Sequence, residues 1–275
     1  NAIAEFLSGS VESFADLMNQ TAQMLGCSSS THFANPSGVH DENHYTTARD
    51  LAIIAQACMK DERFAAIVSQ TSYDMPATQT ESGSAGHPRR TIVGSTAILN
   101  AESTSYYRYA TGIKTGYTRK AGRCLVFGAE RNGMRIIGVV LNCPDWFDEA
   151  ARLMDRAFQR YESVTMLNAG ESLRTLPVAH SGGASVHAVL AADLRGVVMQ
   201  GAIPSIEIDL GSEELDAPVI RGTPLGVARL INGGEVIAEV PLVADADVPR
   251  DDFPAHWRRI WENWLMVENA PVTNG

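Results

Sequence analysis

Residues 112–141 read GIKTGYTRKAGRCLVFGAERNGMRIIGVVL, and this stretch predicts three consecutive antiparallel strands. Asn132-Gly133 separates two apolar segments, and this dipeptide is typical of a two-residue hairpin turn because both residues tolerate a positive φ. The three apolar or alternating segments are Gly112–Lys114, Cys124–Ala129 and Met134–Leu141. The stretch therefore predicts a small antiparallel sheet.

A helix that can cover such a sheet follows in the chain. From Glu149 to Tyr161 the apolar residues recur at helical spacing. Those on the predicted inner face are Leu153, Met154, Ala157 and Phe158. This segment is predicted to be an amphipathic helix packed on the sheet.

Helical patterns also precede the sheet. The apolar spacing over Ala2–Leu25 is interrupted once, which predicts two helices, with Ser10 and Ser13 offering hydroxyl N-caps. Thr47–Asp50 has the pattern of a capping box and predicts a helix that runs through Met59. The polar stretch Thr78–Gly86 predicts an exposed hairpin tip or loop. Together these elements predict an α/β (α+β) domain over residues 1–162.

Beyond Ser163 the pattern changes to short β-prone segments separated by Gly and Pro turns. Asn232-Gly233-Gly234 predicts a hairpin turn between two of them. The predicted strands are Leu173–Val178, Ser185–Leu190, Ile206–Leu210, Gly226–Ile231 and Val236–Val243. Their spacing predicts a separate β-sandwich domain over residues 163–252.

An amphipathic helix is predicted over residues 253–268, followed by a disordered tail at 269–275. One face of the helix carries a stripe at i, i+3, i+4, i+7 and i+8. The stripe consists of Trp257, Ile260, Trp261, Trp264 and Leu265. It could pack against the β domain. The other interpretation is that it lies at a membrane surface as an anchor, because indole rings favour the interface.

The composition limits the classes of function. With 275 residues, of which 45% are hydrophobic, the chain can bury the core of a globular protein. Its net charge of −10 provides no basic surface for a phosphate backbone, so nucleic acid is not expected as a partner. No run of about 18 apolar residues predicts a membrane-spanning helix.

Metal or disulfide chemistry is not the main expectation. The four cysteines are Cys27, Cys58, Cys124 and Cys143. They are not spaced as zinc ligands and are predicted to be small buried hydrophobic residues, with a disulfide between the first two as the alternative. His40 and His44 have i, i+4 spacing but lie among turn residues, so no metal site and no cofactor are predicted.

The residue trio Lys114-Thr115-Gly116 is the main candidate for binding chemistry. The chain has only three lysines but 19 arginines. A lysine on a predicted strand is therefore interpreted as a residue chosen for its chemistry. An ammonium and a hydroxyl suit a peptide carboxylate, and glycine lets the ligand backbone approach an edge strand. The tripeptide is a weak signal by itself, because without further context it more often marks an ordinary strand end.

Three blocks of sequence give this trio a context. They are Gly9–Asn19, the long block Thr31–Ala52, and Gly112–Gly116 with the following Ala121-Gly122 and Arg131–Gly133. Through these blocks the chain resembles the D-alanyl-D-alanine carboxypeptidases, which are low-molecular-mass penicillin-binding proteins of serine peptidase family S11. The β-rich region and the tryptophan helix also resemble this family's sandwich domain and anchor. The stretch Thr91–Tyr107, with Thr96 and Asn100, matches only loosely and leaves the substrate preference open.

The resemblance implies a β-lactamase/transpeptidase-like domain and acyl transfer by a serine of an S-x-x-K motif, assisted by an S-x-N motif. It implies that Lys114 and Thr115 bind the terminal carboxylate of a peptidoglycan pentapeptide or of a β-lactam. The backbone N–H of Tyr117 would be one oxyanion donor. Ser37 in the second block is a further candidate for substrate binding, with a turn-capping hydroxyl as the alternative.

Neither serine motif is present in the sequence. Three residues before the lysines stand Ala57, Thr111 and Tyr117, and no serine lies two residues before an asparagine. We therefore expect the domain to be incomplete at Asn1, with a preceding segment that carries the nucleophile. This chain alone is expected to be inactive.

Other functions remain possible at the level of sequence. A non-catalytic module could bind cell-wall peptide or a partner protein through the same residues. A class A β-lactamase is a further alternative, but the appended β domain argues against it. The resemblance implies a periplasmic or other extracytoplasmic location, with peripheral attachment to the cytoplasmic (inner) membrane surface.

Overall fold

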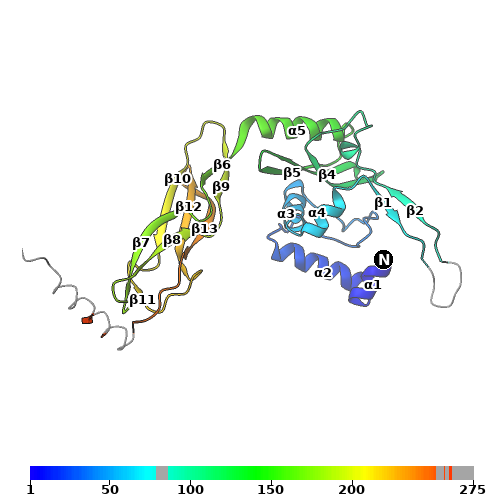
Figure 1. Ribbon diagram of the computed structural model, residues 1–275. Coiled ribbons are helices and arrows are strands. Elements are labelled where there is room, and N and C mark those ends of the chain that lie inside the picture. The colour runs from blue at the N-terminus through cyan, green and yellow to red at the C-terminus, as the bar shows by residue number, and fades with distance from the viewer. Residues whose placement is uncertain (79–85, 252–256, 258–259, 262–275) are drawn as a thin grey trace, which may run out of the picture. The chain divides into compact units, whose positions relative to one another are not determined.

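The computed structural model describes residues 1–78, 86–251, 257 and 260–261 (Figure 1). The chain divides into two compact units, one over Asn1–Arg160 and one that begins at Tyr161. Each unit has its own hydrophobic core. The domain limits expected from the sequence stay predictions, and most of the predicted helix 253–268 and all of the tail 269–275 lie outside the described residues.

The first unit contains the predicted three-stranded sheet. Its strands are β3 (Ala110–Thr118), β4 (Gly122–Arg131) and β5 (Met134–Val140), in the spatial order β3-β4-β5. Both pairings are antiparallel, which confirms the prediction. Asn132 and Gly133 form the turn with φ values of 51° and 75°, and two positive values match the right-handed twist of the strands.

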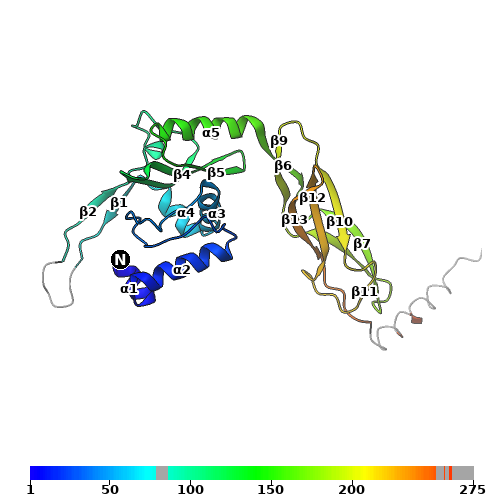
Figure 2. The ribbon, with the colours of Figure 1, turned by 180° about the vertical axis from the view of Figure 1, so that it is seen from behind.

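Helices lie on both sides of this sheet (Figures 1 and 2). On one side lies α5 (Trp146–Arg160), which packs on β4 and β5. On the other side lie α3 (Ala48–Cys58) and α4 (Glu62–Val68). The core between α5 and the sheet includes Leu125, Phe127 and Met154, which are at most 2% exposed.

The covering helix differs from the prediction in its start and its inner face. It begins at Trp146, three residues before Glu149. Leu153 was placed on the inner face, but it is 38% exposed, while Ala150 is fully buried. The inner face is therefore rotated, with Ala150, Met154 and Phe158 toward the sheet.

The N-terminal helices are α1 (Ala2–Ser8) and α2 (Val11–Met24), as predicted. The hydroxyl of Ser10 accepts a hydrogen bond from the N–H of Ser13 at 3.0 Å, which confirms the predicted cap. A hairpin follows α4, with strands β1 (Ser72–Met75) and β2 (Arg90–Val93) on either side of the predicted tip; the two strands themselves were not predicted. Most of the predicted tip, Thr78–Gly86, lies outside the described residues. A short 3₁₀ helix, η1 (Ala97–Leu99), precedes β3.

The second unit is built of strands. They are β6 (Tyr161–Leu167), β7 (Ser172–Ala179), β8 (Ser185–Leu190), β9 (Leu194–Met199), β10 (Ser205–Leu210), β11 (Leu215–Asp216), β12 (Pro224–Asn232) and β13 (Glu235–Ala244). A six-stranded sheet has the order β10-β12-β13-β8-β7-β11, and β6 pairs with β9 in a second sheet. All five predicted strands are present, and β6, β9 and β11 were not predicted.

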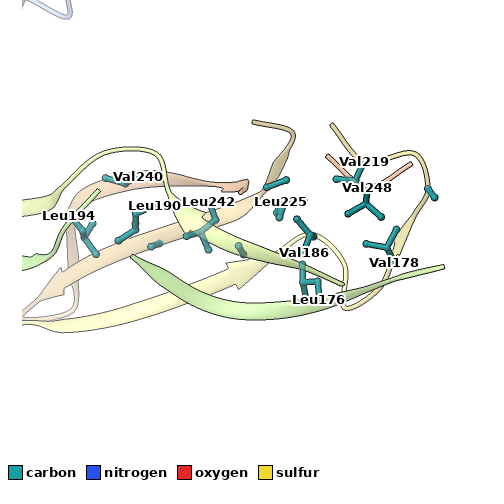
Figure 3. Packing of buried hydrophobic residues seen from close by; sticks show 14 of the residues in the cluster. Leu176, Val178, Val186, Leu190, Leu194, Val219, Leu225, Val240, Leu242 and Val248 are labelled. Atoms are coloured by element: carbon teal, nitrogen blue, oxygen red, sulfur yellow. The ribbon is translucent and has the colours of Figure 1, made fainter. Parts of the chain in front are cut away.

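The two sheets of this unit enclose an apolar core (Figure 3). Its buried members include Leu176, Val186, Leu190, Leu194 and Leu242. The outward face of the large sheet carries charges. There, Arg229 of β12 binds Glu239 of β13 at 2.7 Å and the carboxylates of Glu207 and Asp209 of β10 at 3.3 and 3.2 Å.

The cysteines correct one expectation. All four are free and partly exposed, so they are not buried hydrophobic residues, and the alternative disulfide between Cys27 and Cys58 is not formed. Burial is still sufficient to raise the pKa of the Cys27 and Cys58 thiols above the ordinary value. Among the described residues, no helix is long and apolar enough to cross a membrane.

Candidate substrate-binding edge strand

Strand β3 carries the predicted trio and lies at an edge of its sheet. It pairs with β4 in a register that sets Lys114 opposite Val126, Thr115 opposite Leu125 and Gly116 opposite Cys124. In the part of the chain that the structure describes, no strand pairs with its other side. An edge of this kind can take an extended peptide as an additional strand.

The start of β3 is fixed by the end of α4. A Cβ atom at Gly112 would lie 2.7 Å from the carbonyl oxygen of Val68. Only glycine permits that approach, and Gly112 also has a φ of 125°. The glycine before the trio therefore sets the distance between the strand and the helix layer.

The side chains of the trio differ in exposure. Lys114 and Gly116 are exposed, whereas Thr115 is 9% exposed. The ammonium of Lys114 donates a hydrogen bond to the backbone carbonyl of Thr115. A methyl group at Gly116 would meet no atom within 4 Å, so the strand leaves open space there. Tyr117 follows with 67% exposure.

Thr115 has a partner that the sequence did not reveal. Its hydroxyl lies 2.9 Å from the hydroxyl of Ser95, and either oxygen can be the donor. Ser95 precedes η1 and is 20 residues away in the sequence. It lies in the stretch that matches the family loosely, and no local pattern marked it.

Two tyrosines tie the segment before β3 to α5. The hydroxyl of Tyr107 donates to the carboxylate of Asp155 at 2.8 Å. Burial, then Asp155, raises the pKa of Tyr107 far above its usual range, so it remains a donor. The ring of Tyr109 packs edge to face on the ring of Phe158 in α5, with 6.0 Å between the centroids. The guanidinium group of Arg131 lies 5.2 Å from the centroid of the Tyr109 ring.

Ser37 lies in a local turn. Its hydroxyl donates to the side-chain oxygen of Asn35 at 3.0 Å, and the N–H of Gly38 donates to the same oxygen at 2.8 Å. Within the described residues no hydrogen bond joins Ser37 to β3. The geometry matches the turn-capping alternative, and a role for Ser37 in binding substrate stays a prediction.

The long loop that contains Ser37 is anchored on two helices. From α2, the amide of Asn19 exchanges two hydrogen bonds with the backbone of Phe33, at 2.7 and 2.9 Å. From α3, the carboxylate of Asp50 accepts from the N–H and hydroxyl of Ser28 and from the hydroxyl of Thr31. The two helices thereby hold the arm of the loop that precedes Ser37.

Of the predicted capping box, the structure shows the N-cap half at Asp50. The hydroxyl of Thr47 accepts from the N–H of Asp50 at 3.1 Å, as expected for an N-cap. The carboxylate of Asp50 is 1% exposed and binds the loop residues Ser28 and Thr31. Hydrogen bonds from Ser28 and then Thr31 favour the charged form and hold the pKa of Asp50 far below its usual range.

Described residues of the first unit enclose a larger and a smaller cavity that bear on the site. The larger, of about 960 Å³, lies between α3, α4 and the sheet and is lined by Gln56, Lys60 and Ile137 among others. Neither cavity is lined by Lys114 or Ser37. Volume alone therefore does not mark the candidate site, and the chemistry of β3 is the better guide.

The smaller cavity lies closer to that chemistry. It has about 300 Å³ and is lined by Gly94, Thr96 and Asn100 among others. Gly94 and Thr96 are the two neighbours of Ser95, which contacts Thr115. The two polar residues from the loosely matching stretch, Thr96 and Asn100, are therefore in its wall.

Of the predicted anchor residues, the structure describes Trp257, Ile260 and Trp261. All three are helical, and they are 58%, 49% and 53% exposed. Trp264 and Leu265 lie outside the described residues. In the described ranges, no three His, Cys, Asp or Glu side chains come together as metal ligands.

Comparison with known proteins places these features in a family. The family described as D-alanyl-D-alanine carboxypeptidase matches residues 1–145, and the family described as penicillin-binding protein 5, C-terminal domain, matches residues 161–250. D-alanyl-D-alanine carboxypeptidase DacF of Bacillus subtilis is 28% identical over 97% of this chain and 67% of its own length. DacA of Escherichia coli is 28% identical over 92% of this chain and 60% of its own length. The chain thus spans 60 to 67% of these curated relatives.

Similar solved structures come from the same group of proteins as these sequence matches. Penicillin-binding protein 5 from Haemophilus influenzae has a TM-score of 0.61 at 27% identity, with 90% of this chain and 70% of that chain covered. A penicillin-binding protein 3 from Streptococcus pneumoniae has a TM-score of 0.71 at 24% identity, with 90% and 72% covered, and shows the same fold. The edge strand with Lys114-Thr115-Gly116, the matched first unit and the matched β unit lead to one conclusion: the chain belongs to the D-alanyl-D-alanine carboxypeptidase family.

Proposed function

We propose that this chain is the substrate-binding part of a serine-type D-alanyl-D-alanine carboxypeptidase that trims peptidoglycan stem peptides. The observation that carries the proposal is the trio Lys114-Thr115-Gly116 on an edge strand whose outer side has no strand partner among the described residues. The chain spans about two thirds of its relatives, so the activity is proposed for the protein that contains it.

The trio suits the carboxyl terminus of a D-alanyl-D-alanine peptide. A terminal carboxylate is ionised at neutral pH and only accepts hydrogen bonds. Lys114 provides an ammonium on the exposed side of β3, and the hydroxyl of Thr115 is its neighbour along the strand. The open space at Gly116 allows the peptide backbone to lie against the edge.

The reaction is an acyl transfer. A serine oxygen adds to the carbonyl carbon of the penultimate D-alanine, and the backbone N–H of Tyr117 would stabilise the oxyanion. The peptide bond then breaks, the terminal D-alanine leaves with a proton on its amine, and water hydrolyses the acyl ester. The serine and its base lysine are not in the 275 residues, and we propose that a segment outside this sequence supplies them.

The proposal extends to ligands and location. A β-lactam carries a carboxylate next to its reactive carbonyl group, so the same trio suits it, and the acyl ester would then be long-lived. Stem peptides are outside the cytoplasm, which implies an extracytoplasmic protein. The exposed residues Trp257, Ile260 and Trp261 favour peripheral contact with the cytoplasmic membrane surface.

Covalent labelling by a fluorescent penicillin tests the proposal. In the full gene product that contains this chain, Lys114→Met should slow labelling by about tenfold to a hundredfold, because a hydrogen bond to a charged group is lost. Lys60→Met, in the wall of the larger cavity, is the matched control and should label at the unchanged rate. Equal rates for both variants would contradict the role of Lys114.

A non-catalytic module for cell-wall peptide is the second candidate. The sequence feature that favours it is the lack of S-x-x-K and S-x-N in these 275 residues. The same experiment separates the two. Binding of a D-alanyl-D-alanine peptide without any covalent penicillin adduct in the full gene product would favour the module.

A further inference from the structure

The hydroxyl of Thr115 on the proposed binding strand is paired with the hydroxyl of Ser95, which precedes η1 and has no role in the proposal so far. The two oxygens are 2.9 Å apart, within hydrogen-bond distance. Ser95 is exposed and Thr115 is 9% exposed, so the pair lies at the boundary between the interior and solvent.

The backbone around Ser95 is fixed on both sides. Before it, the N–H of Gly94 donates to the carbonyl of Thr71 at 2.7 Å. After it, Ile98 of η1 is fully buried, and its carbonyl accepts from the N–H of Tyr107 at 2.9 Å. These anchors hold the Ser95 hydroxyl against β3.

The number of protons available determines which of the two hydroxyls donates when a ligand is bound. A hydroxyl group has one proton to donate and can accept two hydrogen bonds. A carboxylate can only accept hydrogen bonds, so the hydroxyl of Thr115 must donate its one proton to the ligand in order to bind it. The hydrogen bond between the two hydroxyls must then run from Ser95 to Thr115.

We propose that Ser95 is a positioning residue that directs the proton of Thr115 toward the carboxylate of the bound ligand. This inference deepens the proposed function and rests on it. With Ser95 as donor, the oxygen of Thr115 is polarised, and its own hydrogen bond to the anion becomes stronger. Without Ser95, the Thr115 hydroxyl is free to rotate, and its proton points at the ligand only part of the time.

The proposal predicts that replacing Ser95 affects some ligands and not others. It concerns only the contact between Thr115 and a negative group, so a ligand whose carboxylate is blocked should be indifferent to Ser95. A residue that merely supports the fold would affect both ligands equally. Benzylpenicillin and its methyl ester form a suitable pair of probes.

The test measures acylation rates of the full gene product with both probes. Ser95→Ala should lower the rate with benzylpenicillin by about threefold to tenfold, as expected for one hydrogen bond. The rate with the methyl ester should stay within about twofold. Ser95→Thr, which keeps the hydroxyl, should restore the rate with benzylpenicillin.

Two further variants exclude a general structural effect. In a Thr115→Val background, Ser95→Ala should cause no additional loss, because the two residues act through one contact. Ser69→Ala is the matched control, since the Ser69 hydroxyl donates to the carbonyl of Ala66 at the end of α4. It should change neither rate.

The outcomes are distinct. An unchanged benzylpenicillin rate in Ser95→Ala, or equal losses with both probes, overturns the inference while the proposed function stands. If the wild-type protein is not acylated at all, the proposed function fails. In that case calorimetry can compare the affinities of the wild type and Ser95→Ala for D-alanyl-D-alanine and for its amide. An affinity for D-alanyl-D-alanine that does not fall, or that falls equally for the amide, would overturn the inference.

Discussion

Asp50 makes a contribution to stability that depends on pH. Its hydrogen bonds from Ser28 and Thr31 favour the charged carboxylate, so its pKa in the folded protein lies below the unfolded value of about 4. A carboxyl group with a lowered folded-state pKa stabilises the protein above the unfolded pKa. That stabilisation is lost as the pH falls from there through the folded-state pKa.

Asp50→Asn should therefore lower the thermal midpoint of the first unit by several degrees at pH 7. The amide cannot accept all three hydrogen bonds from Ser28 and Thr31, and its NH₂ group would face donors. The difference from the wild type should narrow below about pH 4. Circular dichroism melts at both pH values check this, with Asp16→Asn on the exposed side of α2 as the control. A difference in thermal midpoint that stays constant across the pH range would contradict a role for the ionised carboxylate of Asp50.

Single residues also show where sequence reasoning ends. Lys114 was predicted as a site residue because lysine is rare in the chain and because the surrounding blocks of sequence resemble a known family. Ser95 was not, because its contact with Thr115 depends on how η1 packs against β3, which no local pattern encodes. The inferred roles of Lys114, Thr115, Gly116 and Tyr117 stay predictions.

Among the elements, α5 shows how a helical pattern can predict a helix and misplace its inner face. An apolar stripe can be rotated by less than the 100° that separates successive residues and still keep most of its apolar members. The sheet decides the rotation, and it buries Ala150 and Met154 while Leu153 remains 38% exposed.

Truncation of neighbouring residues on α5 tests this rotation. Met154→Ala should destabilise the first unit by about 2 to 5 kcal/mol, because a fully buried side chain leaves a cavity. Leu153→Ala is the matched control and should cost far less. Urea unfolding curves measure both values. A larger loss for Leu153→Ala would mean that the helix packs as the sequence pattern suggested.

Several strands were not predicted from the sequence, each for a different physical reason. Strand β6 follows α5 without a turn, since α5 ends at Arg160 and β6 begins at Tyr161. Strand β9 contains Gly196, which discourages a strand prediction. In the fold a Cβ there would lie 2.8 Å from Cδ1 of Ile237 and 3.0 Å from Cδ2 of Leu230, so the ends of these two side chains would have to shift. The short β1 and β2 are mostly exposed and lack an apolar face.

At the scale of the whole molecule, the proposed contact with a membrane surface can be tested by removing the predicted anchor helix. Deletion of residues 253–266 from the full gene product should reduce its binding to anionic lipid vesicles, because interfacial tryptophans would be removed. Replacement of both Trp257 and Trp261 by alanine should reduce it in the same direction. Co-sedimentation measures the bound fraction, and penicillin labelling of the unbound protein serves as the control for intact folding. Undiminished vesicle binding in the deletion variant would refute the anchor.

The arginine at position 229 has a consequence for how the β unit chooses between alternative strand pairings. Its three carboxylate partners come from both neighbouring strands, β10 and β13. If either neighbour slipped by one residue, its acidic side chains would turn toward the apolar interior and leave the guanidinium unmatched. These surface charges, each weak as a bond, thereby penalise misaligned sheets and help to make the native alignment unique.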